Sequence, residues 1–256
     1  MTSLEIFQFP CLSDNYGVLL HDPSTQATAS IDAPDADAVF AALKEKGWSL
    51  SHILTTHHHH DHTGGNLALK QATGCIIVGP RAEAAKIPGI DVELSEGDTY
   101  SFGSASAQIF ETPGHTLGHI NYWFEDQNLL FSGDTLFTLG CGRVFEGTMN
   151  QMWSSLQKLM ALPGGTIVYS GHEYTIANAA FALSVEPGNA ALRARSELIK
   201  ELRAHNKPTV PTTVQLELET NPFLRPDSVE IQEHLGLIGA DLEQVFGEIR
   251  KRKDSF

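Results

Sequence analysis

The sequence predicts an α/β fold in its first two thirds, followed by a mainly helical region. From the N-terminus to about residue 172, short apolar runs alternate with helical patterns, which is typical of layered sheets with connecting helices. After His172 the hydrophobic spacing is mainly helical. We therefore expect two domains, residues 1–173 and residues 174–256, with the boundary near residue 173.

The predicted strands of the first domain are short runs rich in β-branched, aromatic and aliphatic residues. In chain order they are EIFQF, YGVLL, ATASID, HILTT, CIIVG, AQIFETP, HINYWFED, NLLFSGD and TIVYSGH. Helical spacing covers residues 35–47, 65–74 and 149–162. The first of these helices has Asp35 or Asp37 near its start and Gly47 as a stop signal.

The predicted second domain contains four helical segments joined by one extended stretch. The helices are predicted over residues 173–185, 189–205, 229–236 and 241–253. Between the second and third of them, KPTVPTTVQLELETNPFLRP is rich in proline and is predicted to be extended.

Composition and charge exclude several classes of function. The chain of 256 residues is 41% hydrophobic, with no apolar run of about 18 residues that would span a bilayer. Its N-terminus lacks the basic and apolar regions of a signal peptide, so we expect a cytoplasmic protein without a membrane partner. The net charge of −14 argues against nucleic acid. No apolar surface stripe stands out, and we expect a monomer.

The stretch TTHHHHDHTGG contains more imidazoles than an ordinary loop needs. It follows the apolar run ILTT, and sites gather at the carboxyl ends of strands in open α/β sheets. Alternate residues of an extended segment point to the same side. One phase uses His57 and His59 together with Asp61 and His62; the other uses His58 and His60, and the pattern alone leaves both open.

Three further strand ends supply donors for a metal ion. His115 lies in ETPGHTLGH, Asp134 follows NLLFSG, and His172 follows TIVYSG. With the histidine loop they give seven imidazole and carboxylate donors and no thiolate, which suits zinc, iron or manganese. Seven ligands fit two ions with Asp134 as a bridge, and two close metal ions activate water for hydrolysis.

The motifs THHHHDH, TPGHT, SGDTLF and GHEYT resemble the metal motifs of the metallo-β-lactamase superfamily. A more specific resemblance, to glyoxalase II (the hydroxyacylglutathione hydrolases), runs essentially from end to end. It rests on GDTLF, GCGRVFEGT, GHEYTIANAAFALSVEPGN, ETNPFLR and RKRKDSF. This resemblance implies a four-layer αββα sandwich followed by a mainly helical, glutathione-binding C-terminal domain.

The resemblance also implies a ligand set and chooses the phase of the histidine loop. One metal would be held by His57, His59 and His115, the other by Asp61, His62 and His172, with Asp134 bridging the two. His58 and His60 would then be bystanders. The ions would be two divalent metals per chain, with zinc the first choice and iron or manganese the alternatives.

The implied activity is that of a thioesterase. S-(2-hydroxyacyl)glutathione, such as S-D-lactoylglutathione, would be hydrolysed by a metal-activated hydroxide to D-lactate and glutathione, the second step of methylglyoxal detoxification by the glyoxalase pathway. Asp61 and Asp134 are the candidate catalytic carboxylates, which hold the nucleophile's side of the site and offset metal charge. The leaving thiolate, whose conjugate acid titrates near pH ~8.5, needs no dedicated acid.

The resemblance also names residues for the substrate. Arg250 and Lys253, on one face of the last helix by their i, i+3 spacing, would bind glutathione carboxylates. Tyr174 would donate a hydrogen bond to glutathione. Arg143 stands where many relatives carry lysine, and Phe145 where some carry tyrosine, so one hydroxyl contact is absent. Cys141, in the same loop, is interpreted as a packing residue.

Several other residues and functions fit parts of the pattern. Asp32, after a strand, is predicted either to orient a ligand histidine or to cap a turn, and His119 to lie behind the ligands or to pack. His21, His52 and His205 are interpreted as structural or surface histidines. The alternative functions are a mononuclear-iron persulfide dioxygenase, another hydrolase of the superfamily such as a β-lactamase or lactonase, and a non-catalytic metal-binding scaffold.

Overall fold

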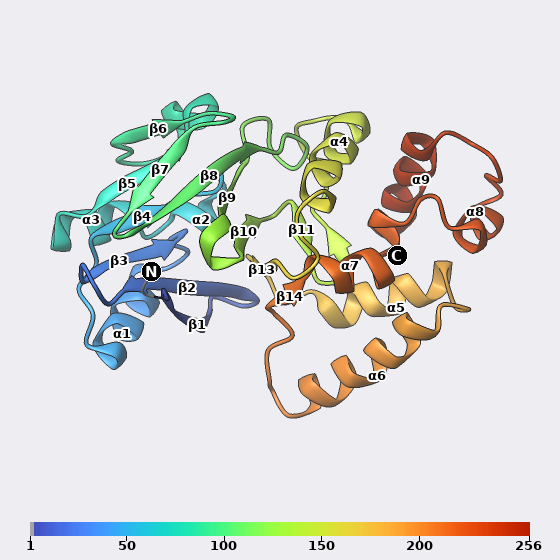
Figure 1. Cartoon of the computed structure of the whole chain (residues 1–256), viewed down its shortest axis with the longest axis horizontal. Helices are drawn as coiled ribbons and strands as arrows, with labels where there is room; N and C mark the ends of the chain where they lie inside the picture. Colours follow the sequence, from blue (N-terminus) through green and yellow to red (C-terminus); the bar gives the residue numbers. More distant parts are fainter. Residues whose placement is uncertain (1–2) are drawn as a thin grey trace. The chain divides into compact units, whose positions relative to one another are not determined.

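The computed structural model describes residues 3–256, and the chain forms two compact units (Figure 1). Unit 1 comprises Met1–Glu111 and Thr116–Gly133, and unit 2 comprises Thr112–His115 and Asp134–Phe256. The donors of the histidine loop lie in unit 1, and His115, Asp134 and His172 lie in unit 2.

The first sheet of unit 1 has six strands in sequence order. β1 (Glu5–Cys11), β2 (Asn15–Asp22) and β3 (Ala27–Ile31) are antiparallel neighbours. β4 (His52–Leu54), β5 (Ile76–Pro80) and β6 (Val92–Leu94) continue the sheet parallel to β3. Because β3 and β4 are parallel, their carboxyl ends meet at one edge, where the Asp32 N–H donates to the Leu54 carbonyl at 3.0 Å.

Helices of unit 1 cover one face of this sheet. α1 (Ala36–Lys46) begins at Asp35, whose side chain accepts the Ala38 N–H, and ends at Gly47 with φ 69°, as the sequence predicts. α3 (Asn66–Thr73) follows the histidine loop and the single-turn α2 (His60–Thr63). Their apolar residues join those of the sheet in one core, formed by Val39, Leu43, Leu69, Ile53 and Ile77 among others.

A second set of strands in unit 1 leads to two further donor motifs, which follow the second and the fourth of these strands in the chain. β7 (Thr99–Phe102), β8 (Ala105–Glu111), β9 (Ile120–Phe124) and β10 (Leu129–Gly133) are successive antiparallel neighbours. The buried Tyr122 hydroxyl on β9 donates to the Thr55 carbonyl beyond β4 at 2.8 Å. The Ile120 N–H donates to the Thr56 carbonyl, so both layers are joined where the histidine loop begins.

Unit 2 begins with a hairpin and a well-capped helix. β11 (Leu136–Phe137) pairs with β12 (Gly140–Cys141), and β13 (Ile167–Ser170) pairs with β14 (Thr212–Thr213). α4 (Met149–Met160) has a capping box formed by Thr148 and Gln151. Trp153 of α4 stacks on Phe246 at 5.6 Å between ring centroids.

The helices predicted after His172 are confirmed. They are α5 (Thr175–Val185), α6 (Ala190–Ala204), α8 (Val229–Leu235) and α9 (Leu242–Asp254). α5 and α6 share a core of Ala179, Ala182, Leu192 and Ile199 with Leu139 of the hairpin turn. Among residues 3–256, none of the helices combines the length and the apolarity that crossing a membrane demands.

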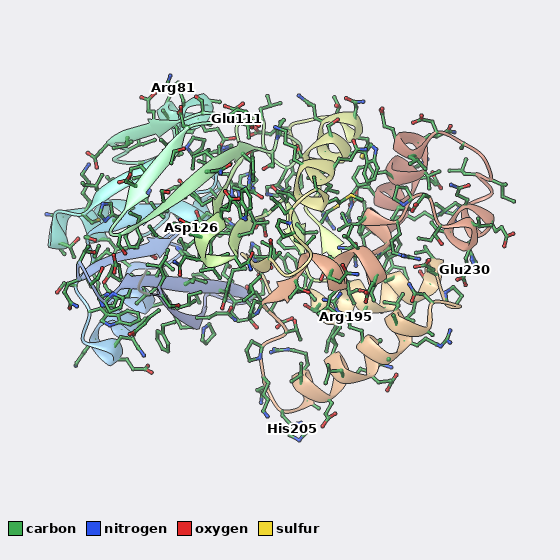
Figure 2. The ribbon with its side chains drawn as sticks, viewed as in Figure 1. Arg81, Glu111, Asp126, Arg195, His205 and Glu230 are labelled. Atoms are coloured by element: carbon green, nitrogen blue, oxygen red, sulfur yellow. The ribbon has the colours of Figure 1, made fainter. Side chains whose placement is uncertain are left out.

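The prediction of an extended segment over residues 207–226 is wrong for its second half. α7 (Val214–Thr220) is helical, capped by the Thr213 side chain, and a 3₁₀ turn (Pro222–Leu224) follows. The alternation in VQLELET suggests a strand, but the buried positions are three residues apart and include the carboxylate of Glu217. Arg195, labelled in Figure 2, pairs with this carboxylate, and the Leu139 N–H donates to it at 2.9 Å.

Candidate metal centre

The histidine loop of unit 1 brings three imidazoles together. The His57 Nε2 atom lies 3.0 Å from Nδ1 of His59, and the rings of His57 and His62 are 4.1 Å apart. His57 and His62 are buried, so their ring nitrogens are largely withdrawn from bulk water, whereas His59 is only partly buried. Imidazole nitrogens gathered in this way can serve as ligands of divalent metal ions.

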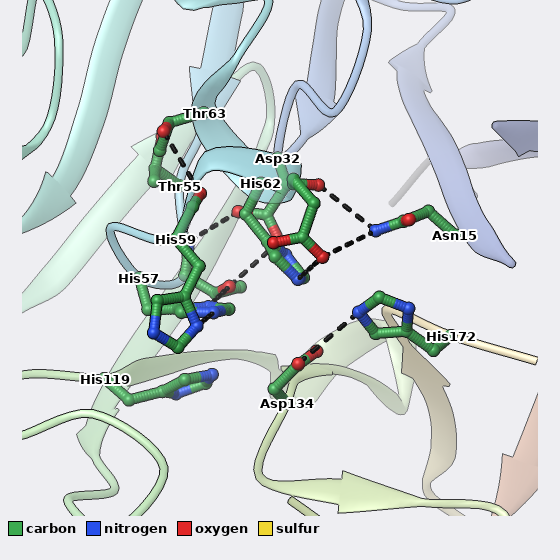
Figure 3. Close-up of polar contacts among 12 residues, drawn as sticks. Asn15, Asp32, Thr55, His57, His59, His62, Thr63, His119, Asp134 and His172 are labelled. Carbon is green, nitrogen blue, oxygen red and sulfur yellow. Dashed lines mark hydrogen bonds and ion pairs between the residues drawn. The ribbon is translucent and has the colours of Figure 1, made fainter. Parts of the chain in front are cut away.

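Asp32 orients His62. Its Oδ2 atom accepts from Nδ1 of His62 at 2.7 Å (Figure 3). The same oxygen accepts from the Thr56 hydroxyl at 2.9 Å, and Oδ1 accepts the Thr56 N–H at 2.7 Å. A carboxylate on one ring nitrogen fixes the tautomer and directs the other nitrogen. The second nitrogen of His62, Nε2, lies 3.6 Å from the Asp61 carboxylate. Of the two interpretations of Asp32 that the sequence leaves open, the structure therefore supports the orienting one.

Asn15 is a site residue that the sequence does not reveal. It begins β2, 46 residues before Asp61, and its side-chain amide donates to the Asp61 carbonyl at 3.1 Å and to its carboxylate at 3.2 Å. Asn15 is buried, whereas the Asp61 side chain is 42% exposed. The amide therefore restricts a carboxylate that would otherwise turn toward water.

His58 and His60 of the loop, and His119 outside it, have different surroundings. The buried Glu83 carboxylate accepts from the His58 N–H at 2.9 Å and lies 2.8 Å from its Nδ1, and it also accepts the Gly118 N–H. His60 is exposed. His119 is fully buried and stacks on His57 with ring centroids 4.8 Å apart, which fits both roles predicted for it, a place behind the ligands and packing.

A second group of donors lies in unit 2. The Oδ2 atom of Asp134 lies 3.4 Å from Nε2 of His115 and also 3.4 Å from Nε2 of His172. Figure 3 shows the pair of Asp134 and His172. The three side chains are at most 8% exposed. One carboxylate oxygen thus faces two imidazoles at equal distance.

The loop that follows the hairpin supports these donors. The Arg143 carbonyl lies 2.9 Å from Nδ1 of His115 and orients this ring through its backbone, a role that no sequence signal indicates. Gly142 N–H donates to the Thr135 carbonyl. A Cβ atom at Gly142 would come within 2.0 Å of the Asp134 carbonyl oxygen, so only glycine fits here.

His172 is held by its sequence neighbours. Its ring stacks on Tyr174 at 4.7 Å with the planes 6° apart, and the Phe137 ring meets both of them edge-on. Between the two, Glu173 accepts from the Thr209 N–H and hydroxyl, at 2.9 Å and 2.7 Å. The two residues that follow His172 in GHEYT are therefore fixed by contacts of their own.

The donor chemistry of both groups fits divalent metal ions. All donors are imidazole nitrogens or carboxylate oxygens, and acids or carbonyls orient two of the imidazoles. Two of the cysteines are unsuited to metal binding. Burial raises the pKa of the Cys141 thiol to about 11, although Arg250 opposes the shift, and burial also raises the pKa of the Cys11 thiol to about 11. A thiol with such a pKa stays protonated at neutral pH.

The residues expected to bind substrate all lie in unit 2. Phe145 is 61% exposed, and its ring centroid lies 5.3 Å from that of His115. Tyr174 is 39% exposed, and the Arg143 side chain is 60% exposed. Lys253 donates to the Ala177 carbonyl, whereas Arg250 is only 3% exposed and donates to the Cys141 carbonyl. Arg250 is therefore more enclosed than a surface cation.

Imidazole and carboxylate donors at strand ends of a layered α/β fold define a class of metal-binding proteins. Comparison with known proteins places the chain in such a class. Residues 14–172 match the metallo-beta-lactamase superfamily, and residues 173–256 match the hydroxyacylglutathione hydrolase C-terminus. Hydroxyacylglutathione hydrolases of Methylococcus capsulatus and Brucella anthropi are each 56% identical over 253 residues. These alignments cover 99% of this chain and 99% and 97% of the two relatives. The chain belongs to the hydroxyacylglutathione hydrolase family of the metallo-β-lactamase superfamily.

A solved structure extends the comparison to the fold. ETHE1 from Myxococcus xanthus superposes with a TM-score of 0.67 at 25% identity, covering 98% of this chain and 99% of that chain. The predicted metallo-β-lactamase fold with a C-terminal helical region is confirmed, as is the resemblance to glyoxalase II.

Proposed function

We propose that this protein hydrolyses S-(2-hydroxyacyl)glutathione thioesters, with S-D-lactoylglutathione as the principal substrate and D-lactate and glutathione as products. Full-length relatives of 56% identity carry the name of this activity, and the C-terminal region matches the family's own C-terminus. In the chain itself, the observation that supports hydrolytic chemistry is the position of Asp134. One of its two carboxylate oxygens, Oδ2, lies 3.4 Å from both His115 and His172. The reaction places the enzyme at the second step of methylglyoxal detoxification.

We assign the metal ligands as the resemblance implies. The orientation of His62 by Asp32, of Asp61 by Asn15 and of His115 by the Arg143 carbonyl supports this assignment, as does the engagement of His58 with Glu83. The two ions are divalent; imidazole and carboxylate donors accept zinc, iron and manganese, and zinc is our first choice. In the set that the resemblance implies, His57, His59 and His115 would hold one ion, Asp61, His62 and His172 would hold the other, and Asp134 would be a ligand of both.

The proposed reaction divides its roles between the ions and the chain. Bound divalent ions supply Lewis acidity and bring the pKa of water down to about 7. Asp61 and Asp134 would offset the positive charge of the ions. They would lie on the side of the site from which the nucleophile attacks the thioester carbonyl. Asp32 and the Arg143 carbonyl keep the imidazoles in one tautomer throughout the cycle. The leaving thiolate of glutathione departs without an acid, because its conjugate acid titrates near ~8.5.

The glutathione part of the substrate has partners of matching chemistry in unit 2. Arg143, Arg250 and Lys253 supply positive charge for its carboxylates, and cation–carboxylate hydrogen bonds are stronger than neutral ones. The partly exposed hydroxyl-bearing ring of Tyr174 is suited to a hydrogen bond with the peptide backbone of glutathione. Phe145 offers apolar contact in place of a hydroxyl.

The proposal includes the organisation of the chain. We place a catalytic domain at residues 1–173 and a glutathione-binding domain at residues 174–256, in agreement with the two family matches, which meet at residues 172 and 173. We also propose a monomer in the cytoplasm, acting on a small molecule, without nucleic-acid or membrane partners. The net charge of −14 supports the exclusion of nucleic acid.

The direct test is hydrolysis of S-D-lactoylglutathione, followed by the loss of thioester absorbance. Lactoyl-coenzyme A and nitrocefin serve as parallel substrates, each measured before and after chelation and after metal is restored. We expect fast turnover of the glutathione thioester alone, its loss on chelation and its recovery with added metal. Turnover of nitrocefin, or equal turnover of both thioesters, would contradict the glutathione-specific function. Oxygen consumption without hydrolysis would indicate the dioxygenase alternative.

A further inference from the structure

The last turn of α9 contains an acid among the cations proposed to bind substrate. The Asp254 Oδ1 atom accepts from Nε of Arg250 at 3.0 Å and lies 2.8 Å from its Nη2. The same oxygen lies 3.8 Å from Nε of Arg143. An acid in this place at first sight opposes the binding of an anionic substrate, so its presence calls for a physical reason.

Asp254 fixes one edge of the Arg250 guanidinium, and other contacts fix the rest of the group. The Nη1 atom of Arg250 donates to the Cys141 carbonyl at 2.9 Å, and the guanidinium lies over the Phe223 ring at 4.8 Å. A planar guanidinium held at an edge, at a corner and on one face has a single orientation. Its side chain is only 4% exposed, so this orientation is set before any ligand arrives.

The contact of Asp254 with Arg143 reaches the loop beside the metal donors. Arg143 orients His115 through its carbonyl, while its exposed side chain extends toward Asp254. Asp254 therefore connects α9 to this loop through the Arg143 side chain. Arg250 connects α9 to the same loop through the Cys141 carbonyl. Without the acid, the exposed Arg143 side chain would have more rotamer freedom. The entropy lost on ordering it would then oppose substrate binding.

Lys253 completes the group of cations. Its ammonium donates to the Ala177 carbonyl at 3.1 Å and lies over the rings of Phe181 and Phe256, at 5.6 Å and 5.5 Å from their centroids. Burial lowers the pKa of Lys253, the positive charges of Arg250 and Arg143 lower it further, and Asp254 raises it. The three cations therefore repel one another, and the acid reduces that repulsion.

We propose that Asp254 is a positioning residue for substrate recognition, which holds Arg250 and Arg143 in the geometry that receives a carboxylate of glutathione and offsets the repulsion among the three cations. The inference rests on the proposed function. Asp254 itself touches neither the reacting atoms nor the metal donors, so it acts on the affinity for the glutathione part and not on the chemical step.

The test compares two thioesters in the variant Asp254→Asn. One is S-D-lactoylglutathione; the other is S-lactoyl-N-acetylcysteamine, which has the same acyl group and no carboxylate. Replacement of a charged hydrogen-bond acceptor by a neutral one halves the strength of such bonds, so we expect KM for the glutathione thioester to rise about tenfold. We expect kcat to stay unchanged, kcat/KM for the truncated thioester to stay unchanged, and Asp254→Glu to restore part of the loss.

Glu248→Gln is the matched control, because it removes the same charge from the same helix. Glu248 pairs with Arg252 at 2.9 Å, one turn apart on α9, and Arg252 is outside the group of three cations. The control should leave both thioesters unaffected. If Asp254→Asn leaves KM for the glutathione thioester unchanged or lowers it, the acid merely competes with substrate and the inference is wrong.

Equal losses for both thioesters would indicate a general structural role and would also overturn the inference. The wild-type measurement separates this failure from failure of the proposed function. A wild-type enzyme without preference for the glutathione thioester would contradict both. A wild-type preference that is undiminished in Asp254→Asn would contradict the positioning role alone.

Discussion

The metal donors and the substrate cations are held in place by different means. Each donor motif follows a strand end, and buried acids, amides or carbonyls within hydrogen-bond distance orient the side chains, as Asp32 does for His62. The cations come from a loop and from the last helix, and they are ordered by a shared counter-ion, by the Cys141 carbonyl and by aromatic rings. Strand ends therefore position the donors proposed to hold metal, and packing of the last helix positions the cations proposed to bind substrate.

This difference predicts different kinetic consequences. A change behind the metal donors alters ligand geometry and should reduce metal affinity and kcat together. A change among the cations removes binding to a distant part of the substrate and should mainly raise KM. The loop of Gly142 and Arg143 belongs to both regions, since its backbone supports His115 and Asp134 while the Arg143 side chain reaches Asp254.

The largest of the expected effects concerns Asp32. The variant Asp32→Ala removes the acceptor that fixes the tautomer of His62, and loss of such a partner typically costs 10–100-fold in metal affinity or activity, so we expect about that loss in both. The measurement is metal content after dialysis together with kcat for S-D-lactoylglutathione. Asp35→Ala serves as a control, because Asp35 lies on the same segment but caps α1. Full activity and metal content in Asp32→Ala would show that His62 needs no partner.

A smaller effect of a different kind is expected for Lys253. The variant Lys253→Met keeps the apolar stem between Phe181 and Phe256 but removes the charge. We expect KM for the glutathione thioester to rise about tenfold with kcat nearly unchanged, since a hydrogen bond to a charged group contributes about 1.5–3 kcal/mol and this site is partly hydrated. Steady-state kinetics of Lys251→Met, on the same helix, give the control. A fall in kcat without a change in KM would remove the distinction between the two regions.

The smallest effect is expected for Cys141. Burial raises the pKa of its thiol to about 11, and the neighbouring Arg250 lowers it only in part, so the group is protonated and unreactive at pH 8. Its backbone carbonyl, which accepts from Arg250, survives substitution. We expect Cys141→Ala to retain wild-type kcat/KM, and iodoacetamide to leave the wild-type enzyme active at pH 8. Alkylation should accelerate only as the pH approaches 11, and rapid inactivation at pH 8 would reveal a reactive thiolate.

Much of the fold is predictable from local patterns. Asp35 and Gly47 mark the ends of α1, and each donor motif follows a strand that its apolar run predicts. The exception is α7, where alternation suggests a strand but burial of the Glu217 carboxylate with Arg195 favours a helix. Such a buried pair joins residues 22 positions apart, so no local pattern can reveal it.

The candidate site is likewise only partly predictable from the sequence. The donors are identified by residue type and by resemblance, but their supports are not, because Asn15 and Asp61 meet only after folding, and so do Glu83 and His58. The Arg143 carbonyl acts through its backbone, which every residue type possesses. The enclosure of Arg250 is likewise invisible in the sequence, where it resembles its exposed neighbours in the last helix.

The central claim is that the two donor groups hold two ions with Asp134 between them. The most direct measurement titrates metal-free protein with zinc while metal binding and S-D-lactoylglutathione hydrolysis are followed together, for the wild type and for Asp134→Ala. The account predicts two equivalents per wild-type chain, full activity only near the second, and loss of both metal and activity in Asp134→Ala. Full activity at one equivalent, or an Asp134→Ala variant that keeps both ions and its turnover, would contradict it.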